Sequence, residues 1–506
     1  MRLSKQLLIE KMKHKRRYHL LLFLGIAFLE IFFIYGNYRD EKGLADGWMI
    51  LFYNLPIMNS LFFPVLISAF ASRLMDIEHK GDMLKCLYTY ESPIKLFITK
   101  AMYGFLSICL LVMIHLGSIL LMAKLLAFPL HFAPKYLLFY AMNTLLSCSM
   151  LFFLHLILAY FFRNQAVSIS IGLIGSFVGL FSAYLPTSMF QKLLPWSTFI
   201  NSLFIGMDWN RKTRDVKWLL LDFKYDSAIC AICWIIIFAI FAIICLKRSG
   251  VEEKDFSKVR RTTDTKVRIH RRPIEFMKLK GSPSWFAFFI IPVLSAVIGT
   301  LNYLGNLEIL KNGWFSLWTQ HTLFLCYFFM PVIIAIFTGC VWRLEHHGAN
   351  MNILLTHASP QKIILNKYVV SVFITTLSLI WIVAIYILSG LICHIKGSLP
   401  ADLILWLVYG LIGAYAICAI QLFLSLVIRN FALPVMIAFA GGIAGLACIA
   451  KNMPYALPYS LFSLAMTENN QNMNVPRFLL SSLFFVILFL LLSVSYLKRT
   501  DARSQE

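Results

Sequence analysis

Two copies of one polar motif hold the most regularly spaced ionisable side chains in this sequence. Glu78-His79-Lys80-Gly81 recurs later in the chain as Glu345-His346-His347-Gly348. Carboxylate, imidazole and ammonium groups at fixed spacing can make charged contacts with a partner. A polar loop kept twice inside an apolar chain therefore indicates a contact site rather than a spacer. Each copy is followed, at the same spacing, by a Ser-Pro pair and a lysine: Ser92-Pro93 and Lys100, then Ser359-Pro360 and Lys367.

The chain carries none of the motifs that are typical of soluble catalysis. It has no Gly-rich Walker A loop followed by Lys and Ser or Thr, no Gly-x-Ser-x-Gly elbow and no His-Glu-x-x-His pair. We therefore expect a protein that is not an enzyme and binds no cofactor itself. The free energy that drives it must come from another molecule, and two docking loops without a nucleotide site suggest a separate ATPase with two docking surfaces.

The cysteines and histidines predict neither a disulfide framework nor a metal site. Most of the 11 cysteines lie in or beside apolar stretches, where a thiol packs as a small hydrophobic group. Cys230 and Cys233 have the spacing of a redox or metal pair, but packing is the better interpretation inside an apolar helix. His115 and His155 each stand alone in a predicted span, and we expect each to hydrogen-bond to a neighbouring helix.

Composition places the chain in a lipid bilayer. Of its 506 residues, 59% are hydrophobic and 14% are charged, and its mean hydropathy is +0.75. A soluble globular domain has a more even balance. Apolar runs of about 20 residues, long enough to cross the hydrocarbon core, recur along the whole chain. They predict about twelve spans, six in each half.

The predicted fold is an all-α integral membrane protein, and the spans are expected at the following positions. In the first half they are Tyr18–Gly36, Ile50–Ser72, Leu96–Ala123, Tyr136–Phe162, Val167–Leu185 and Asp226–Leu246. In the second half they are Ser284–Tyr303, Thr319–Val341, Ile363–Cys393, Leu403–Ile428, Ala432–Ile449 and Arg477–Leu497.

Further landmarks recur in the same order, which predicts a tandem duplication. Six spans per copy give both halves the same orientation, so the repeat is parallel rather than inverted. We expect a first module at residues 1–248, a basic cytoplasmic linker at 249–272 and a second module at 273–506. The recurring landmarks include Ile9-Glu10 with Ile274-Glu275, and Leu194-Pro195-Trp196-Ser197 with Leu457-Pro458-Tyr459-Ser460.

The basic residues predict the orientation of the chain in the membrane. Most of them fall on the side that holds both termini, the repeated loops and the linker, so this side is expected to be cytoplasmic. The formal net charge of +22 is dispersed over these loops, which is typical of membrane topology rather than of nucleic-acid binding. Lysines alternating with apolar residues before the first span predict an amphipathic helix lying on membrane lipid, with a counterpart at about 267–280.

One further residue and two segments of the chain are candidates for a functional role. Glu30 is the one acidic residue placed deep in a predicted span, and an unpaired carboxylate there is costly. It could face a transport path and contact a cationic peptide or relay protons, or it could be a buried neutral acid. Leu185–Ile200 and Lys451–Tyr459 contain prolines next to predicted spans, which makes re-entrant hairpins plausible there.

These residues resemble the permeases of ABC-2 type exporters. The resemblance rests on an amphipathic helix, six spans per copy, and a first cytoplasmic loop with Glu, Gly, Ser-Pro and a Lys that opens the third span. The Glu-His-Lys form of the loop, with Trp48 upstream and Pro64 in the second span, is most similar to lantibiotic-immunity permeases. The present chain looks like a fused form with two halves.

The resemblance implies a mechanism, a partner and roles for the motif residues. It implies a coupling helix at about Asp76–Tyr90 and another at about Arg343–His357, each seated on an ABC ATP-binding protein, present as two copies or a fused pair. ATP and Mg²⁺ would bind in that partner. Glu78 and Glu345 would contact the seat, and Pro93 and Pro360 would stop each coupling helix. Lys100 and Lys367 would snorkel to headgroups. The implied location is the bacterial cell membrane.

Three functions remain open at this level. The first is the permease of an exporter that moves an antimicrobial peptide, such as a lantibiotic or bacteriocin, or another hydrophobic or cationic compound. The second is a membrane sensor that couples peptide binding to a kinase, although its loops look short for that role. The third is an ion-driven secondary transporter, which would usually carry more than one intramembrane carboxylate.

Overall fold

The computed structural model divides into two compact units, Met1–Val267 and Arg268–Glu506. The division falls inside the predicted linker, which lies outside the described residues beyond position 252. The described residues are 3–14, 23–25, 27–28, 31–32, 46–79, 83–128, 134–182, 192–209, 216–252, 275, 279, 282, 284–343, 345–346, 350–467 and 473–499.

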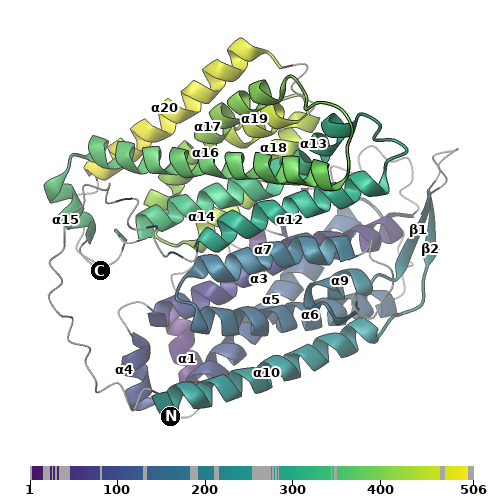
Figure 1. The fold of residues 1–506 in the computed structure, drawn as a ribbon. Coiled ribbons are helices and arrows are strands. Elements are labelled where there is room, and N and C mark those ends of the chain that lie inside the picture. Colours follow the sequence, from purple (N-terminus) through teal and green to yellow (C-terminus); the bar gives the residue numbers. More distant parts are fainter. Residues whose placement is uncertain are drawn as a thin grey trace. The chain divides into compact units, whose positions relative to one another are not determined.

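Unit 1 is a bundle of long apolar helices with a short helix at one end and a β-hairpin at the other (Figure 1). Its helices are α1 (Leu3–His14), α3 (Gly47–His79), α4 (Met83–Tyr90), α5 (Pro93–Leu125), α6 (Pro134–Phe161), α7 (Gln165–Phe181), the 3₁₀ turn η4 (Pro195–Ser197), α9 (Thr198–Asn201) and α10 (Asp226–Glu252). Its strands are β1 (Ile205–Trp209) and β2 (Val216–Leu220).

Unit 2 repeats this order of helices. They are α12 (Ser284–Gly305), α13 (Gly313–Phe324), the π-helical turn η6 (Leu325–Phe329), α14 (Met330–Arg343), α15 (Asn350–His357), α16 (Pro360–Ile392), α17 (Leu403–Val427), α18 (Ala432–Ala450), α19 (Pro458–Met466) and α20 (Val475–Arg499). The repeat is close in length as well as order: α4 and α15 both have 8 residues, and α5 and α16 both have 33.

Ten helices of the described residues are long and apolar enough to cross a membrane, which confirms a multi-pass membrane protein. Two of the twelve expected spans are not among them. The first, Tyr18–Gly36, lies largely outside the described residues, and Glu30 lies there too. The fifth, Val167–Leu185, forms the shorter apolar helix α7. The expected span Thr319–Val341 is part of a longer one, Gly313–Arg343, which runs through α13, η6 and α14.

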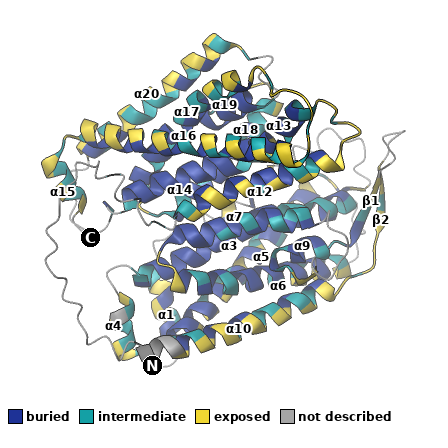
Figure 2. Cartoon of the chain, in the orientation of Figure 1, coloured by how far each residue is buried: buried dark blue, intermediate teal, exposed yellow. Residues whose placement is uncertain are grey.

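The helices divide into central and peripheral ones. The most apolar window of α3 is 78% buried, whereas that of α10 is 17% buried. In unit 2 the Gly313–Arg343 span is 89% buried and α20 is 17% buried. Figure 2 shows this as dark central helices and mixed colours on α10 and α20. The peripheral helices therefore present their apolar side chains to lipid.

Small residues allow the central helices to approach closely, as is common in membrane bundles. Gly172 of α7 faces Ser68 and the Pro64 carbonyl of α3, so a Cβ at this position would lie 2.7 Å from that oxygen. In unit 2, Gly442 of α18 faces the Tyr327 carbonyl in η6, and a Cβ would lie 1.9 Å from it. The same helix pair is thus brought together by glycine in both units.

The segments after α7 and α18 fold back against them, in the regions where re-entrant hairpins were considered. In unit 1 the described part of this segment forms η4 and α9. In unit 2 it forms α19, which packs against α17 and α18. Trp196 lies beside Gly175, and Tyr459 lies at the matching place beside Gly441.

The β-hairpin in unit 1 was not expected from the sequence. Its strands are antiparallel, with Ile205 opposite Leu220 and Trp209 opposite Val216. Phe204 and Ile205 at its base are buried in an aromatic cluster with the first turns of α3. The hairpin is a small addition to an otherwise helical membrane fold, and it lies at the end of the bundle opposite α4.

Candidate functional site: a repeated ion cluster beside two short helices

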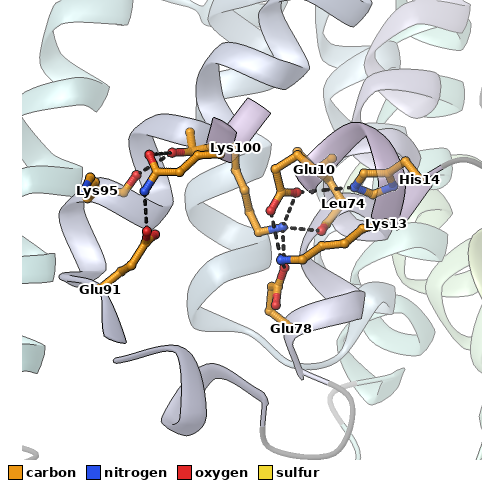
Figure 3. A network of polar contacts seen from close by, with 10 residues as sticks. Glu10, Lys13, His14, Leu74, Glu78, Glu91, Lys95 and Lys100 are labelled. Carbon is orange, nitrogen blue, oxygen red and sulfur yellow. Dashed lines mark hydrogen bonds and ion pairs between the residues drawn. The ribbon is translucent and has the colours of Figure 1, made fainter. Parts of the chain in front are cut away.

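The repeated acidic and basic residues of unit 1 meet in a buried ion cluster (Figure 3). Lys100 on α5 donates to Glu10 on α1 at 3.0 Å and lies 2.8 Å from Glu78 at the end of α3. It also donates to the Leu74 carbonyl at 3.2 Å. Lys13 on α1 bridges the same two carboxylates, at 3.0 Å from Glu10 and 2.8 Å from Glu78. The cluster therefore ties α1, α3 and α5 together.

Unit 2 contains the same arrangement around Lys367 on α16. This lysine donates to Glu345 at 2.7 Å and to Glu275 at 3.0 Å. It donates to the Val341 carbonyl at 2.9 Å, the position that matches Leu74. Its ammonium group lies 4.6 Å from the centre of the Trp342 ring, a cation–π contact. Both units thus place a lysine between two carboxylates and a backbone carbonyl at matching positions, although the other contacts of the lysine differ.

Burial corrects the expectation that the two lysines reach lipid headgroups. Lys100 and Lys367 are 0% exposed, and the carboxylates of Glu78 and Glu345 are 1% and 4% exposed. A buried ammonium group is costly unless it is paired and hydrogen-bonded, and here each one has two carboxylates and a carbonyl. The lysines therefore hold helices together, and neither glutamate is open to a partner in this structure.

The electrostatic balance of the unit 1 cluster can be followed at Glu10 and Lys13, which lie outside the spans. Burial raises the pKa of Glu10, but the hydrogen bond to His14 and the charges of Lys100 and Lys13 outweigh it, so the pKa is lowered. Burial lowers the pKa of Lys13, but contacts with Glu78 and Glu10 outweigh it, so this pKa is raised. Both groups are thus ionised at neutral pH.

The motif histidines make a matching pair of contacts. The Nε2 atom of His79 lies 2.8 Å from the Ala159 carbonyl near the end of α6. The Nε2 atom of His346 lies 2.8 Å from the Ser425 carbonyl near the end of α17. Each histidine thereby connects the end of the second span to the fourth helix of its bundle. Gly81 and Gly348, the last residues of the motifs, lie outside the described residues.

The short helices after the motifs are α4 and α15, and they end where the sequence predicted, at Tyr90 and His357. They begin later than expected, because Asp76–His79 forms the last turn of α3 and Arg343 is the last residue of α14. Pro93 and Pro360 are the first residues of the next helices, α5 and α16. A proline suits this position, where its missing N–H costs nothing.

The two short helices expose matching faces. The positions that are exposed in both helices are Met83, Cys86, Thr89 and Tyr90 in α4, and Asn350, Ile353, Thr356 and His357 in α15. Their spacing of three, six and seven residues places them on one side of a helix. Tyr90 is 83% exposed and Ile353 is 57% exposed, although both follow apolar spans. The described side chains of these faces include no Asp, Glu, Lys or Arg, and they are open to a partner.

The amphipathic helix α1 turns a polar stripe towards α5. Gln6, Glu10 and His14 are buried, and Gln6 accepts a hydrogen bond from Thr99 at 3.1 Å. Leu8 and Met12 are 58% and 66% exposed, which suits a helix that lies on a membrane surface. In unit 2 only positions 275 and 279 of the counterpart are described.

Sequence reasoning did not assign a role to Glu10 or Glu275. The signal was present, because Ile9-Glu10 recurs as Ile274-Glu275, but nothing in the sequence links these residues to lysines about ninety positions later. The described residues contain no group of three or more His, Cys, Asp or Glu that could hold a metal ion.

Comparison with known families gives one match. The model of the family described as ABC-2 family transporter protein matches residues 6–179 and 273–445, which together are more than half of the chain. The two matched regions begin at α1 and at its counterpart and end in α7 and α18, so each lies within one copy of the repeat. Searches of curated proteins and of solved structures found no match. The chain therefore belongs to the ABC-2 family of transporter proteins.

Proposed function

We propose that this chain is the permease of an ATP-driven exporter, and that α4 and α15 dock on separate ATP-binding subunits. One observation carries the proposal: two copies of one buried ion cluster lie beside two short helices whose exposed faces match position by position. Because this exposed face occurs once in each unit, it suits a partner that is itself present in two copies. Two ATP-binding subunits, or a fused pair, would provide two such seats on the cytoplasmic side, where both termini would also lie.

Within this proposal the motif residues position the docking helices rather than contact the partner. Glu78 and His79 fix the end of α3, and Pro93 begins α5, so α4 is held between two long helices. Lys100 binds the α3 end to α5 and α1. A displacement of α4 would therefore be transmitted to α1, α3 and α5 together. The contacts with the ATPase would come from the exposed residues, such as Tyr90 and Ile353.

The transport step follows from a change in the partner. ATP, bound with Mg²⁺ in the ATP-binding subunits, would draw these together and move the two docking helices. Packed helices shift between discrete arrangements rather than deforming continuously, so such a movement biases each bundle between inward-facing and outward-facing packings. The buried ion clusters make the linkage stiff, because separating their charges in the membrane is costly.

We further propose that the cargo is an antimicrobial peptide of the lantibiotic or bacteriocin type, or another hydrophobic or cationic compound, expelled across a bacterial cell membrane. The support for this is the Glu-His-Lys loop with Trp48 and Pro64, which is similar to lantibiotic-immunity permeases. Pro64 lies within α3, and Trp48 packs on Phe52 in its first turns. Glu30 stays a candidate for the transport path, outside the described residues.

The test is co-purification of the tagged chain with a candidate ATP-binding subunit. A Cys86→Arg, Ile353→Arg variant places a charge on both docking faces without touching either ion cluster. We expect it to fold normally but to lose bound ATPase and the ATP turnover that the complex shows. Ala401→Arg is the matched control, because this exposed residue precedes α17 at the opposite end of unit 2.

The outcomes separate the proposal from its alternatives. Loss in the double variant with retention in Ala401→Arg supports docking through α4 and α15. Equal binding of the ATPase by the double variant contradicts it. Failure of the wild-type chain to bind any ATP-binding subunit, while it stays folded in lipid, would favour an ion-driven transporter instead.

A further inference from the structure

The β1–β2 hairpin of unit 1 leaves an unusual number of apolar side chains exposed. Five such residues lie within a short stretch of chain. Met207, Val216, Leu219, Leu220 and Leu221 are 44%, 41%, 50%, 48% and 40% exposed. An exposed cluster of this kind indicates a surface that is covered by something other than water.

The hairpin is a fixed element rather than a loose connection. At its base, Phe204 and Ile205 are 0% and 1% exposed, and the Leu221 amide donates to the Phe204 carbonyl at 2.8 Å. Along β2, the Trp218 ring lies 5.2 Å from the Tyr53 ring of α3. The exposed apolar residues are therefore held in a fixed position relative to the membrane-spanning helices.

Both faces of the hairpin carry apolar side chains. Because side chains alternate along a strand, Val216 and Leu220 point to the face of Trp218, and Leu219 points to the other face beside Lys217. The Leu219 face also carries Asp208 and Lys217, which are exposed and lie farther from the base of the hairpin. Only the base, with Leu219 on one face and Leu220 on the other, is therefore apolar on both sides, and water is a poor match for it.

Aromatic residues place the hairpin base at the edge of the bilayer. Tyr53, Tyr136, Trp48 and Phe223 surround the buried cluster that contains Phe204. They belong to the first turns of α3 and α6 and to the segment before α10, where these apolar helices begin. Rings of this type gather where a protein passes from hydrocarbon to headgroups. Lys135 lies over the Tyr136 ring at 5.1 Å, as expected of an interfacial pair.

The segment after the hairpin leads into a helix whose apolar side chains are open to lipid. Asp222, Lys224 and Asp226 are exposed in this segment, beside Tyr225, which is 60% exposed. On α10 the apolar window is only 17% buried, and Ile229 is 59% exposed. The base of the hairpin is thus joined, through a short segment that contains charged residues, to a helix suited to lipid contact.

We propose that the β1–β2 hairpin rests on phospholipid at the membrane face opposite α4, with Leu219, Leu220 and Leu221 in the apolar boundary below the headgroups. Lys217 and Lys224 are exposed on the same segment and can reach the headgroup phosphates. No strand occurs among the described residues of unit 2, so within that part of the chain this contact belongs to unit 1 alone.

The test uses the full chain in nanodiscs of phosphatidylcholine and phosphatidylglycerol, without a partner protein. The variant Leu219→p-benzoylphenylalanine is irradiated, and lipid adducts are counted by intact-protein mass spectrometry. The same probe at Ile236, 53% exposed on α10, is the reference for lipid contact. The probe at Tyr90, at the other end of unit 1, is the reference for a position in water. All three sites are exposed, so the substitutions leave the core intact.

We expect position 219 to form lipid adducts at a level similar to position 236 and several-fold above position 90. A level equal to that of position 90 would overturn the proposal. Adducts between protein chains in place of lipid adducts would also overturn it, because they would show that a second copy covers the hairpin. A parallel probe at Leu220 tests the opposite face, where the proposal again requires lipid adducts.

Discussion

Replacing Lys367 with methionine should destabilise unit 2 strongly, although methionine fits an apolar helix. The substitution keeps most of the side-chain volume and removes one charge. It leaves the buried carboxylate of Glu345, and that of Glu275, without the cation that lies 2.7 Å and 3.0 Å from them. It also removes the donor to the Val341 carbonyl.

The size of the effect follows from the geometry. At an effective dielectric constant of about 20, one charge pair at this distance attracts by roughly 6 kcal/mol, and desolvation offsets part of that. Removing one member of a buried pair costs about 3–5 kcal/mol, which corresponds to a fall in Tm of roughly 10 °C for a unit of this size. Lys367 is 0% exposed, so solvent screening does not reduce this value.

The assay is thermal denaturation of the purified chain in detergent, followed by size-exclusion chromatography with fluorescence detection. Lys362→Met is the matched control, because Lys362 lies on the same helix and is exposed. Adding Glu345→Gln to Lys367→Met should recover part of the loss, since it removes a carboxylate left without its lysine. If Lys367→Met and Lys362→Met denature at the same temperature, the cluster does not stabilise the bundle and the reasoning is refuted.

Three further predictions concern the same framework. Lys100→Met should cost less than Lys367→Met in the same assay, because Lys13 stays beside both carboxylates in unit 1. Gly442→Ala should cost about 1–3 kcal/mol by overpacking against the Tyr327 carbonyl, whereas Gly117→Ala, with nothing within 4 Å, should be neutral or slightly stabilising. Glu10 has a lowered folded pKa, so its stabilisation is present above its ordinary pKa of 4.5 and is lost as the pH falls through the lower folded value. The Tm difference between wild type and Glu10→Gln should therefore shrink below about pH 4.5; a constant difference would contradict the assigned charge.

The helices could be predicted from the sequence because long apolar runs have one stable form in lipid. The runs that became α5 and α16 differ from the predicted spans mainly at their first turns, where Pro93 and Pro360 begin the helices. The hairpin could not be predicted, because its strands are short and charged residues separate the two strands in the sequence. In addition, β2 contains two consecutive leucines, Leu219 and Leu220, that lie on opposite faces. Such a segment has the composition of a loop.

The ends of the two short helices could be predicted from the sequence, but the contacts of the motif residues could not. The repeated motif indicated where a contact element lies, and α4 and α15 end at the expected residues. Sequence alone could not show whether Lys100 reaches headgroups or a buried carboxylate, since its partner Glu10 lies on a different helix, 90 residues earlier in the chain. Only the packing of α1 against α5 decides this. The exposed face of α4 likewise depends on which side of an eight-residue helix the bundle covers.

The central claim is that α4 and α15 both contact an ATP-binding subunit, and site-specific crosslinking tests it most directly. p-Benzoylphenylalanine would be placed at Tyr90 or at His357 in the chain assembled with that subunit, and at Met207 on the opposite membrane face as the control. The proposal predicts that positions 90 and 357 each crosslink to the ATP-binding subunit and that position 207 does not. Contact at neither position 90 nor 357, in a complex that hydrolyses ATP, would contradict it.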